Sequence, residues 1–504
     1  MLEFFSAFSS ILQPNIIIYI FLGTLAGVLV GSMPGLSSIM GLSILMPFTF
    51  SLGGDTGILM LLGMFCGSIF GGSVTAILIN TPGTANSAAT CLDGYPMANK
   101  YGQPGRALSI SIMASTFGGI FSAVMLLFTS PILAKFALRF GSPEFFALAI
   151  FGLSIVAGIS SKSLVKGLIS TLIGLLLATV GINSFTGEFR FTFDSVYLSA
   201  GISFVPVLIA LYAFSQGLAM VESGESSKKA SVKVNKVFPS IKDVKRVSPT
   251  ILRSSFLGTV IGTIPGTGGD IASWVGYNEA KRWSKNPEKF GDGAPEGIAA
   301  PEAANNAISG GALIPLLTLG IPGDAGTAIM LGALMMQGII PGPLLFEQQT
   351  EKVYIIIGGL ILANIFMCII GYCGVKYFSK ITTISSKILT PIIFIFCFVG
   401  TFSINNNVND IYFMIIAGII GYILIKNEFP LPPIILGLIL GGIAEKNLER
   451  SLALSEGDLM IFIERPISLT LLIVALISMI YPIIHSKIRK RKSIIDSMDS
   501  GKDL

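Results

Sequence analysis

Apolar runs follow one another along nearly the whole chain, and they constrain its fold more than any other feature. A helix needs about 20 apolar residues to cross a bilayer, and several of these runs are shorter than that. We therefore expect about ten to twelve transmembrane helices together with broken or re-entrant helices, in an all-α polytopic membrane protein. The runs are 15–33, 37–52, 56–80, 107–130, 144–160, 163–182, 196–221, 250–264, 296–321, 325–340, 352–377, 388–404, 408–426, 430–444 and 467–486.

The composition excludes the soluble classes of protein. Only 12% of the 504 residues are charged and 52% are apolar, whereas soluble domains carry about 25% charged residues. Several soluble domains could not cover their surfaces with so few charges. A soluble enzyme, a disordered protein and a nucleic-acid-binding protein are therefore excluded.

The basic residues gather in two places. Residues 222–248 contain seven Lys and Arg, and a second cluster begins at Lys487. Cytoplasmic loops of membrane proteins carry such an excess of positive charge. We expect a cytoplasmic linker at 222–248 and a cytoplasmic tail, with the N-terminus, which lacks Lys and Arg, on the outer side.

The two halves of the chain repeat one pattern, G-x3-G-x2-P-G. Gly27, Gly31, Pro34 and Gly35 match Gly258, Gly262, Pro265 and Gly266 at one constant offset. Each half then has a Gly-Gly pair followed by a second Pro-Gly pair, at 82–83 and 322–323. Inverted repeats with interrupted helices at matching positions indicate the binding site of a secondary transporter. We expect membrane repeats at 1–221 and 249–447, an additional transmembrane segment at 448–486 and the basic tail at 487–504.

The four Pro-Gly interruptions are the predicted functional site. A helix that begins within the membrane presents free N–H groups and a positive dipole end, which suit a carboxylate. A helix that ends there offers carbonyl oxygens to a cation. The candidate substrate-binding residues are Pro34, Gly35, Ser37, Ser38, Asn80, Pro82, Gly83, Thr84, Asn86, Pro265, Gly266, Thr267, Gly268, Gly269, Pro322 and Gly323.

The coupling ion is expected beside the last interruption, and Na⁺ is the first choice. The candidate ligands are Asn305, Asn306, Asp324 and Thr327, which supply oxygen atoms. A proton carried by Asp324 is the alternative. We expect no other cofactor, because the one histidine and five cysteines form no metal-binding pattern.

Other prominent residues have simpler explanations. The glycine ladders of 23–35 and 63–71 are typical of close helix packing. Asp93 is interpreted as a loop residue, and Arg106 as an anchor at the cytoplasmic end of a helix, with pairing to an anionic substrate as its alternative. The chain contains neither a Walker A nor a G-x-S-x-G motif, so we expect no enzyme.

These same blocks resemble the large membrane subunit of the tripartite tricarboxylate transporters, the TctA family. They are GGSVTAILINTPGTANSAATCLDGYPMA from Gly71, IGTIPGTGGD from Ile261, APEGIAAPEAANNAISGG from Ala294, and FPLPPIILGLILGGIAEKNLERSL from Phe429. The resemblance covers nearly the whole chain. It departs from the family pattern at Gln103-Pro104 and at Glu279-Ala280-Lys281, both in expected loops.

The resemblance implies a bacterial inner-membrane permease that is driven by an ion gradient. It also implies two partners, a small four-helix membrane subunit and a periplasmic binding protein that delivers a small carboxylate. From the residues alone, a stand-alone secondary transporter remains open, with a channel and a membrane-embedded enzyme as less favoured readings.

The charge pattern makes the first testable prediction. Topology reporters fused at Ser227 and Ser493 should both report the cytoplasm, because the basic clusters lie there. A phosphatase and a fluorescent-protein fusion at each position measure this independently. Signals from opposite sides of the membrane would contradict the inverted repeat.

Overall fold

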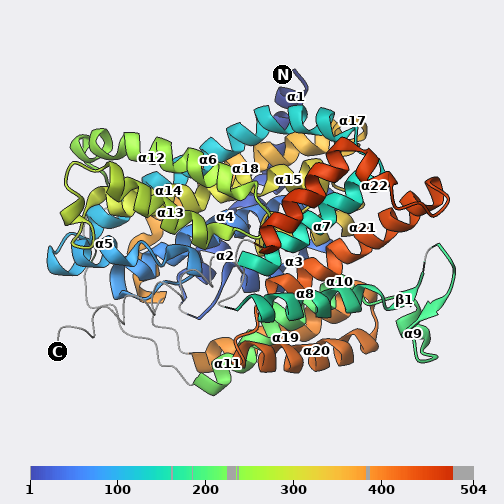
Figure 1. Cartoon of the computed structure of the whole chain (residues 1–504). Coiled ribbons are helices and arrows are strands. Elements are labelled where there is room, and N and C mark those ends of the chain that lie inside the picture. The colour runs from blue at the N-terminus through green and yellow to red at the C-terminus, as the bar shows by residue number, and fades with distance from the viewer. Residues whose placement is uncertain are drawn as a thin grey trace, which may run out of the picture. The chain divides into compact units, whose positions relative to one another are not determined.

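The computed structural model describes residues 2–33, 35–159, 163–183, 185–223, 234, 238–381 and 386–480. The predicted tail, residues 224–233 and 235–237 of the basic linker, and Pro34 lie outside these residues. The described chain is almost entirely helical, apart from one two-stranded hairpin (Figure 1). The all-α class is therefore confirmed.

Seven of the described helices are long and apolar enough to cross a membrane. They are Pro14–Gly31, Gly54–Ile79, Pro104–Ala137, Phe204–Glu222, Thr350–Gly374, Lys387–Asn405 and Val408–Lys426. Shorter apolar helices lie between them, as expected of broken helices, and one more follows the last of them: Ser38–Phe50, Ser142–Ile155, Leu164–Ala178, Ala325–Met336 and Pro466–Ile480. The chain is a multi-pass membrane protein, and the total of ten to twelve spans stays a prediction.

The chain forms two compact units, and each unit takes segments from both halves of the sequence. The first unit comprises residues 1–138 and 203–423. Its elements are α1 (Leu2–Ile11), α2 (Pro14–Gly31), α3 (Ser38–Phe50), α4 (Gly54–Ile79), η1 (Ala85–Ser87), α5 (Cys91–Tyr95), η2 (Pro96–Lys100), α6 (Pro104–Ala137), α10 (Phe204–Leu208), η3 (Ile209–Phe214), α11 (Ser215–Ser223), α12 (Ile241–Gly262), α13 (Gly268–Trp283), η4 (Pro287–Lys289), α14 (Pro295–Gly311), α15 (Leu313–Leu319), α16 (Ala325–Met336), α17 (Leu345–Gln348), α18 (Thr350–Ile381), α19 (Ser386–Asn405) and α20 (Val408–Lys426) as far as Ile423.

Glycines let the long helices of the first unit approach each other closely. A Cβ atom on Gly27 of α2 would lie 2.4 Å from the carbonyl oxygen of Met64 on α4, and one on Gly67 would lie 2.3 Å from that of Thr24. In the second half, a Cβ on Gly258 of α12 would lie 2.2 Å from the carbonyl oxygen of Ala304 on α14. Any side chain there would push the backbones apart, so these glycines serve close packing, as predicted.

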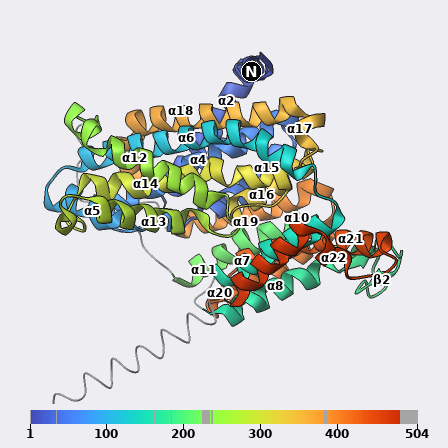
Figure 2. The same ribbon diagram turned by 45° about the horizontal axis from the view of Figure 1, so that its top comes forward.

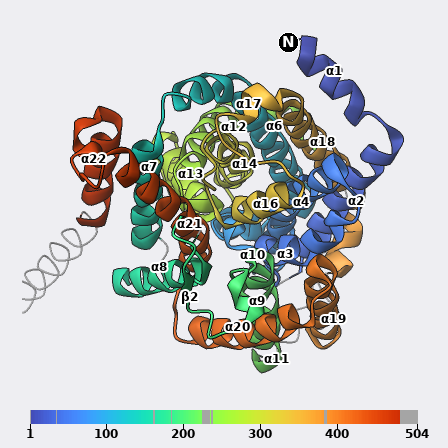
Figure 3. The ribbon, with the colours of Figure 1, turned by 90° about the vertical axis from the view of Figure 1, so that its right-hand side faces the viewer.

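Helices from the two halves of the sequence also pack against each other within the first unit. α6, from the first half, packs against α14 of the second, while α18, from the second half, packs against α4 of the first. Figure 3 shows α14 surrounded by α6, α12 and α13. Two further contacts also join the halves. α13 of the second half packs on η1 of the first, and α3 of the first half packs on α16 of the second. Matching segments of the two halves thus make matching contacts, and the inverted repeat itself stays a prediction.

Ion pairs close one end of this helix cluster. The guanidinium group of Arg106, at the start of α6, lies 2.6 Å from the Asp243 carboxylate of α12 and holds the pKa of that carboxyl below its usual range. Arg246 of α12 pairs with Glu296 of α14 at 2.7 Å. Arg106 thus has an internal partner, in keeping with an anchor. α12 begins at Ile241, inside the predicted linker, because Ser240 caps it by accepting from the Asp243 N–H at 3.1 Å.

The second unit comprises residues 139–202 and 424–504. Its helices α7, α8 and α21 lie side by side (Figure 2). A hairpin of β1 and β2 is joined to α21 by the ion pair of Arg190 with Glu445 and by the Asn183 amide, which donates to Glu449 at 2.6 Å. The elements are α7 (Ser142–Ile159), α8 (Leu164–Ala178), β1 (Gly181–Ile182), β2 (Phe189–Arg190), α9 (Val196–Ser199), α21 (Pro432–Leu454), α22 (Ile461–Glu464) and the helix Pro466–Ile480.

Two glycines of α21 provide a matched test of this packing. A Cβ on Gly437 would lie 2.6 Å from the Thr171 carbonyl oxygen of α8, whereas one on Gly442 would meet no atom within 4 Å. Gly437→Ala should destabilise the protein by about 1–3 kcal/mol through overpacking. Gly442→Ala should change stability by less than about 1 kcal/mol, in the stabilising direction. Thermal unfolding in detergent measures both variants, and equal effects would mean that α8 and α21 are not in close contact.

Candidate functional site

The first interruption separates α2 from α3. Gly35 has a φ of 89°, a conformation that favours glycine. Ser37 caps α3, because its hydroxyl accepts from the Met40 N–H at 3.1 Å. The hydroxyl oxygen of the next residue, Ser38, is buried without a hydrogen-bond partner. Pro34, also predicted here, lies outside the described residues.

The second interruption follows α4, which ends in a left-handed residue, Asn80, with a φ of 53°. The N–H of Gly83 donates to the Gly72 carbonyl at 3.2 Å, and a Cβ on Gly83 would lie 2.1 Å from the Gly31 carbonyl oxygen. Two backbone segments therefore meet at residue 83, and only glycine leaves room for this contact. Pro82 is exposed beside it, while the buried hydroxyl of Thr84 has no hydrogen-bond partner.

The third interruption separates α12 from α13. The Gly266 N–H donates to the Gly323 carbonyl at 2.7 Å, so the third and fourth interruptions touch directly. Thr267 donates its hydroxyl to the Ile261 carbonyl at 2.6 Å. Pro265 is buried. The N-cap residue Thr267 makes no side-chain cap bond, but the Asp270 carboxylate in the first turn of α13 interacts with the N–H groups of Asp270 and Ile271.

The fourth interruption repeats the second. α15 ends in a left-handed residue, Gly320, with a φ of 73°. A Cβ on Gly323 would lie 2.6 Å from the Gly262 carbonyl oxygen, which matches the contact of Gly83 with Gly31. Pro322, between them, is buried.

Asp324 and Thr327 form a capping box at the start of α16. The Asp324 carboxylate accepts from the N–H of Thr327 at 2.7 Å, and the Thr327 hydroxyl accepts from the Asp324 N–H at 2.9 Å. This arrangement satisfies the first turn of the helix. The N-terminal end of α16 is therefore already occupied by a carboxylate of the chain itself, that of Asp324.

Asn86 joins the second interruption to the second half of the chain. Its main-chain carbonyl accepts from the Asn305 amide of α14 at 3.0 Å. A Cβ on Gly269 of α13 would lie 2.8 Å from the Asn86 side chain. The second, third and fourth interruptions therefore lie close together. The first interruption is connected to the fourth, because α3, which follows the first, packs against α16, which follows the fourth.

The four predicted ion ligands form two pairs. Asn306 donates to the Asn305 side chain at 2.7 Å, and Asp324 is bonded to Thr327. Among the described residues no hydrogen bond joins the two pairs. Asn306 has a buried side-chain oxygen without a partner, so one oxygen of this pair is available to a ligand.

Two further residues belong to this region and were missed by sequence analysis. Tyr212 lies on the π-helical turn η3, its buried hydroxyl has no partner, and it interacts electrostatically with Asp324. Glu302 lies fully buried on α14, one turn before Asn305 and Asn306. Glu302 could have been found, because an acidic residue within an apolar run is a functional candidate by default. Nothing in the sequence singles out Tyr212.

Asp270 is exposed at the start of α13 and is close enough to Asp324 to interact with it electrostatically. Neither carboxylate forms an ion pair within the described ranges. Two like charges that face one site favour a cation between them.

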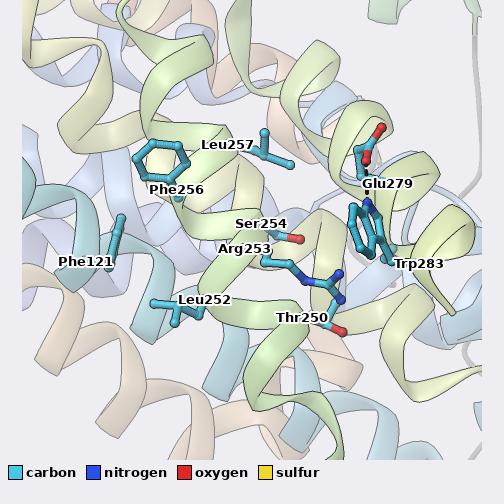
Figure 4. A pocket seen from close by; sticks show the side chains of 10 residues that line it. Phe121, Thr250, Leu252, Arg253, Ser254, Phe256, Leu257, Glu279 and Trp283 are labelled. Atoms are coloured by element: carbon cyan, nitrogen blue, oxygen red, sulfur yellow. Dashed lines mark hydrogen bonds between the residues drawn. The ribbon is translucent and has the colours of Figure 1, made fainter.

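A separate groove lies on the first unit, between α6, α12 and α13, with a volume of about 440 Å³ (Figure 4). The Arg253 guanidinium lies 5.5 Å from the centre of the Trp283 ring, whose indole N–H donates to Glu279 at 3.1 Å. Most of the lining is apolar, and no residue of the four interruptions takes part. The groove is therefore distinct from the predicted site.

The capping box gives a prediction of stability. Asp324→Asn should keep the cap, because asparagine is an equally good N-cap residue. Asp324→Ala should lose it and destabilise the protein by about 0.5–2 kcal/mol. Thermal unfolding in detergent compares the two variants. Equal destabilisation would show that the charge of Asp324, rather than its capping bond, holds α16.

Residues 17–436 match the family model described as the tripartite tricarboxylate transporter TctA family. A protein of Agrobacterium vitis, named an uncharacterized 52.8 kDa protein in the TAR-I ttuC' 3' region, is 38% identical over 493 residues, which cover 98% of each chain. A second protein of that organism, named an uncharacterized protein in the TAR-II ttuC' 3' region, is 39% identical over 237 residues, 47% of this chain and 98% of its own. No solved structure matches the chain significantly. The chain is therefore a member of the TctA family of tripartite tricarboxylate transporters.

Proposed function

We propose that this protein is the large permease subunit of a tripartite transporter that imports a small carboxylate, driven by an ion gradient that is most simply Na⁺. Membership of the TctA family supports a transporter subunit. The finer proposal depends on one observation: the helix interruptions, which are far apart in the sequence, meet within one unit. Their meeting concentrates unpaired polar groups in an otherwise apolar protein.

The groups at the interruptions suit a carboxylate together with a cation. The start of α13 has a positive dipole end, and the Asp270 carboxylate already interacts with N–H groups of its first turn. Buried hydroxyls of Ser38 and Thr84 lack partners and can donate to a ligand. Asp270 and Asp324 lie nearby without a basic partner among the described residues, and they would repel a bare carboxylate. A bound Na⁺ lowers that repulsion, which gives a physical reason for binding substrate and ion together.

The remaining parts of the proposal follow from the family. A tripartite system implies further subunits, and we propose a small four-helix membrane subunit and a periplasmic binding protein as partners in a bacterial inner membrane. The carboxylate is a tri-, di- or monocarboxylate. A stand-alone carboxylate transporter is the second candidate, and uptake without any binding protein would favour it. A channel would conduct without saturating, and a membrane-embedded enzyme would convert its substrate.

Transport assays test the coupling. In proteoliposomes containing the full transporter, uptake of labelled citrate, used as a tricarboxylate probe, should follow an imposed Na⁺ gradient. Asp324→Asn should weaken the Na⁺ dependence while the fold survives, because the cap is kept. Asn306→Ala should also weaken it, because it removes the unpaired oxygen.

Three outcomes would change the proposal. Uptake that follows a pH gradient and ignores Na⁺ would replace Na⁺ by a proton. An unchanged Na⁺ dependence in both variants would move the ion to the matching interruption at 80–87. Accumulation that needs no gradient would contradict secondary transport altogether.

A further inference from the structure

Glu302 is a buried carboxylate that the proposed transport site does not use. It lies on α14, and its side chain is fully buried, with 0% of its surface exposed. No lysine, arginine or histidine pairs with it in the described part of the chain. A full negative charge at that depth is costly unless something compensates it.

Four hydroxyl groups surround this carboxylate. Three of them contact one carboxylate oxygen, Oε2: Ser73 at 2.6 Å, Ser115 at 3.0 Å and Ser111 at 3.2 Å. The fourth, from Thr90, contacts Oε1. None of the four residues exposes any surface. They come from α4, from α6 and from the segment that follows the second interruption.

Hydroxyl hydrogen bonds stabilise the carboxylate but leave its net charge in place. The neighbouring charges are already engaged or lie elsewhere on the helices that pack against α14. Arg106 pairs with Asp243, Arg246 with Glu296, and Asp55 with Lys352. Asp93 of α5 accepts from the N–H groups of Gly291, Gly293 and Ala294. The remaining charged residues of α6, α12 and α13 are Lys135, Lys242, Lys245, Arg253, Asp270, Glu279, Lys281 and Arg282, and the Cys91 thiol also interacts electrostatically with Glu302.

We propose that Glu302 and the hydroxyl groups of Ser73, Thr90, Ser111 and Ser115 form a buried Na⁺ site, separate from the ion proposed at Asp324. Carboxylate and hydroxyl oxygens are the hard ligands that such a cation prefers. A hydroxyl group can rotate its proton away from the carboxylate and turn a lone pair toward the ion. The cation then supplies the positive charge that the protein lacks at this point.

The position of the site connects it with transport. Thr90 lies three residues after the second interruption ends at Ser87, and Asn305, one turn beyond Glu302, binds the Asn86 carbonyl. An ion at Glu302 therefore ties α14 and α6 to the segment that carries Asn86. We infer that this Na⁺ orders the second interruption before the carboxylate binds.

The test measures Na⁺ binding without substrate. The full-length chain is purified in detergent and melted in sodium, potassium or choline chloride at constant ionic strength and pH. Asp324→Asn serves as the background, because it removes the one charged ligand of the ion proposed at the interruption and so weakens binding there. On this background Na⁺ should still raise the melting temperature relative to choline, since a ligand that binds the folded state stabilises it.

Adding Glu302→Gln to this background should abolish the Na⁺ response. Thr90→Val should raise the Na⁺ concentration that gives half of the effect by about tenfold or more, because loss of even an outer-shell partner lowers metal affinity by about 10–100-fold. The matched control is Glu144→Gln. Glu144 is also buried, but it has a counter-cation in Arg465 at 3.2 Å, so this variant should keep the response.

Several results would overturn the site. They are an equal Na⁺ response with and without Glu302→Gln, no Na⁺ response in the background protein, or a melting temperature that follows pH and not Na⁺. If Glu302→Gln does not fold, Thr90→Val and Ser115→Ala decide the matter by the shift in half-saturation, and an unchanged value contradicts the site. Citrate uptake is not part of this measurement, so failure of the transport proposal and failure of this site are distinguishable.

Discussion

The backbone at the helix interruptions has to find hydrogen-bond partners inside an apolar protein, and the first unit is organised around this requirement. The Gly83 and Gly266 N–H groups donate to the carbonyls of Gly72 and Gly323. These bonds are short enough only because glycine lets one backbone come directly against another. An unpaired group at this depth would cost several kcal/mol.

Segments from the two halves also pack against each other around these interruptions. The backbone hydrogen bonds of the interruptions lie within each half, and an element of the opposite half packs on two of them: α13 packs on η1, and α3 packs on α16. This packing also brings Asn86, Gly269 and Asn305 together, although they are far apart along the chain. The polar site is therefore a consequence of how the two halves pack.

α14 is the central element of this arrangement. It packs against α6, α12 and α13, and one of its faces carries Glu302, Asn305 and Asn306. Its polar side chains bond to hydroxyls and to the backbone of the first half. α14 is too polar to count among the apolar spans, yet nearly all of it is buried. A polar helix in such a position is stable only when its partners are fixed by the surrounding helices.

The sequence by itself determined the class of the protein, the positions of the interruptions and the role of the glycine ladders. Apolar runs, low charge and Pro-Gly pairs are local properties, and a local pattern is enough to predict where a helix stops. The sequence also predicted Asp324 and Thr327 as polar groups at a break, but their role as a cap depends on the geometry of a single turn.

Only the tertiary structure decided which of these groups meet. The pairing of Asn305 with Asn86, the closeness of Asp270 to Asp324, and the hydroxyl cage around Glu302 join residues from different helices. The division into two units, each built from both halves, could not be predicted from the sequence either. Hydrophobic periodicity shows which face of a helix is buried. It does not show which helix covers that face, because an apolar surface can pack against any other apolar surface of similar shape. Hydrogen bonds between distant segments select the partner, and they exist only once the chain has folded.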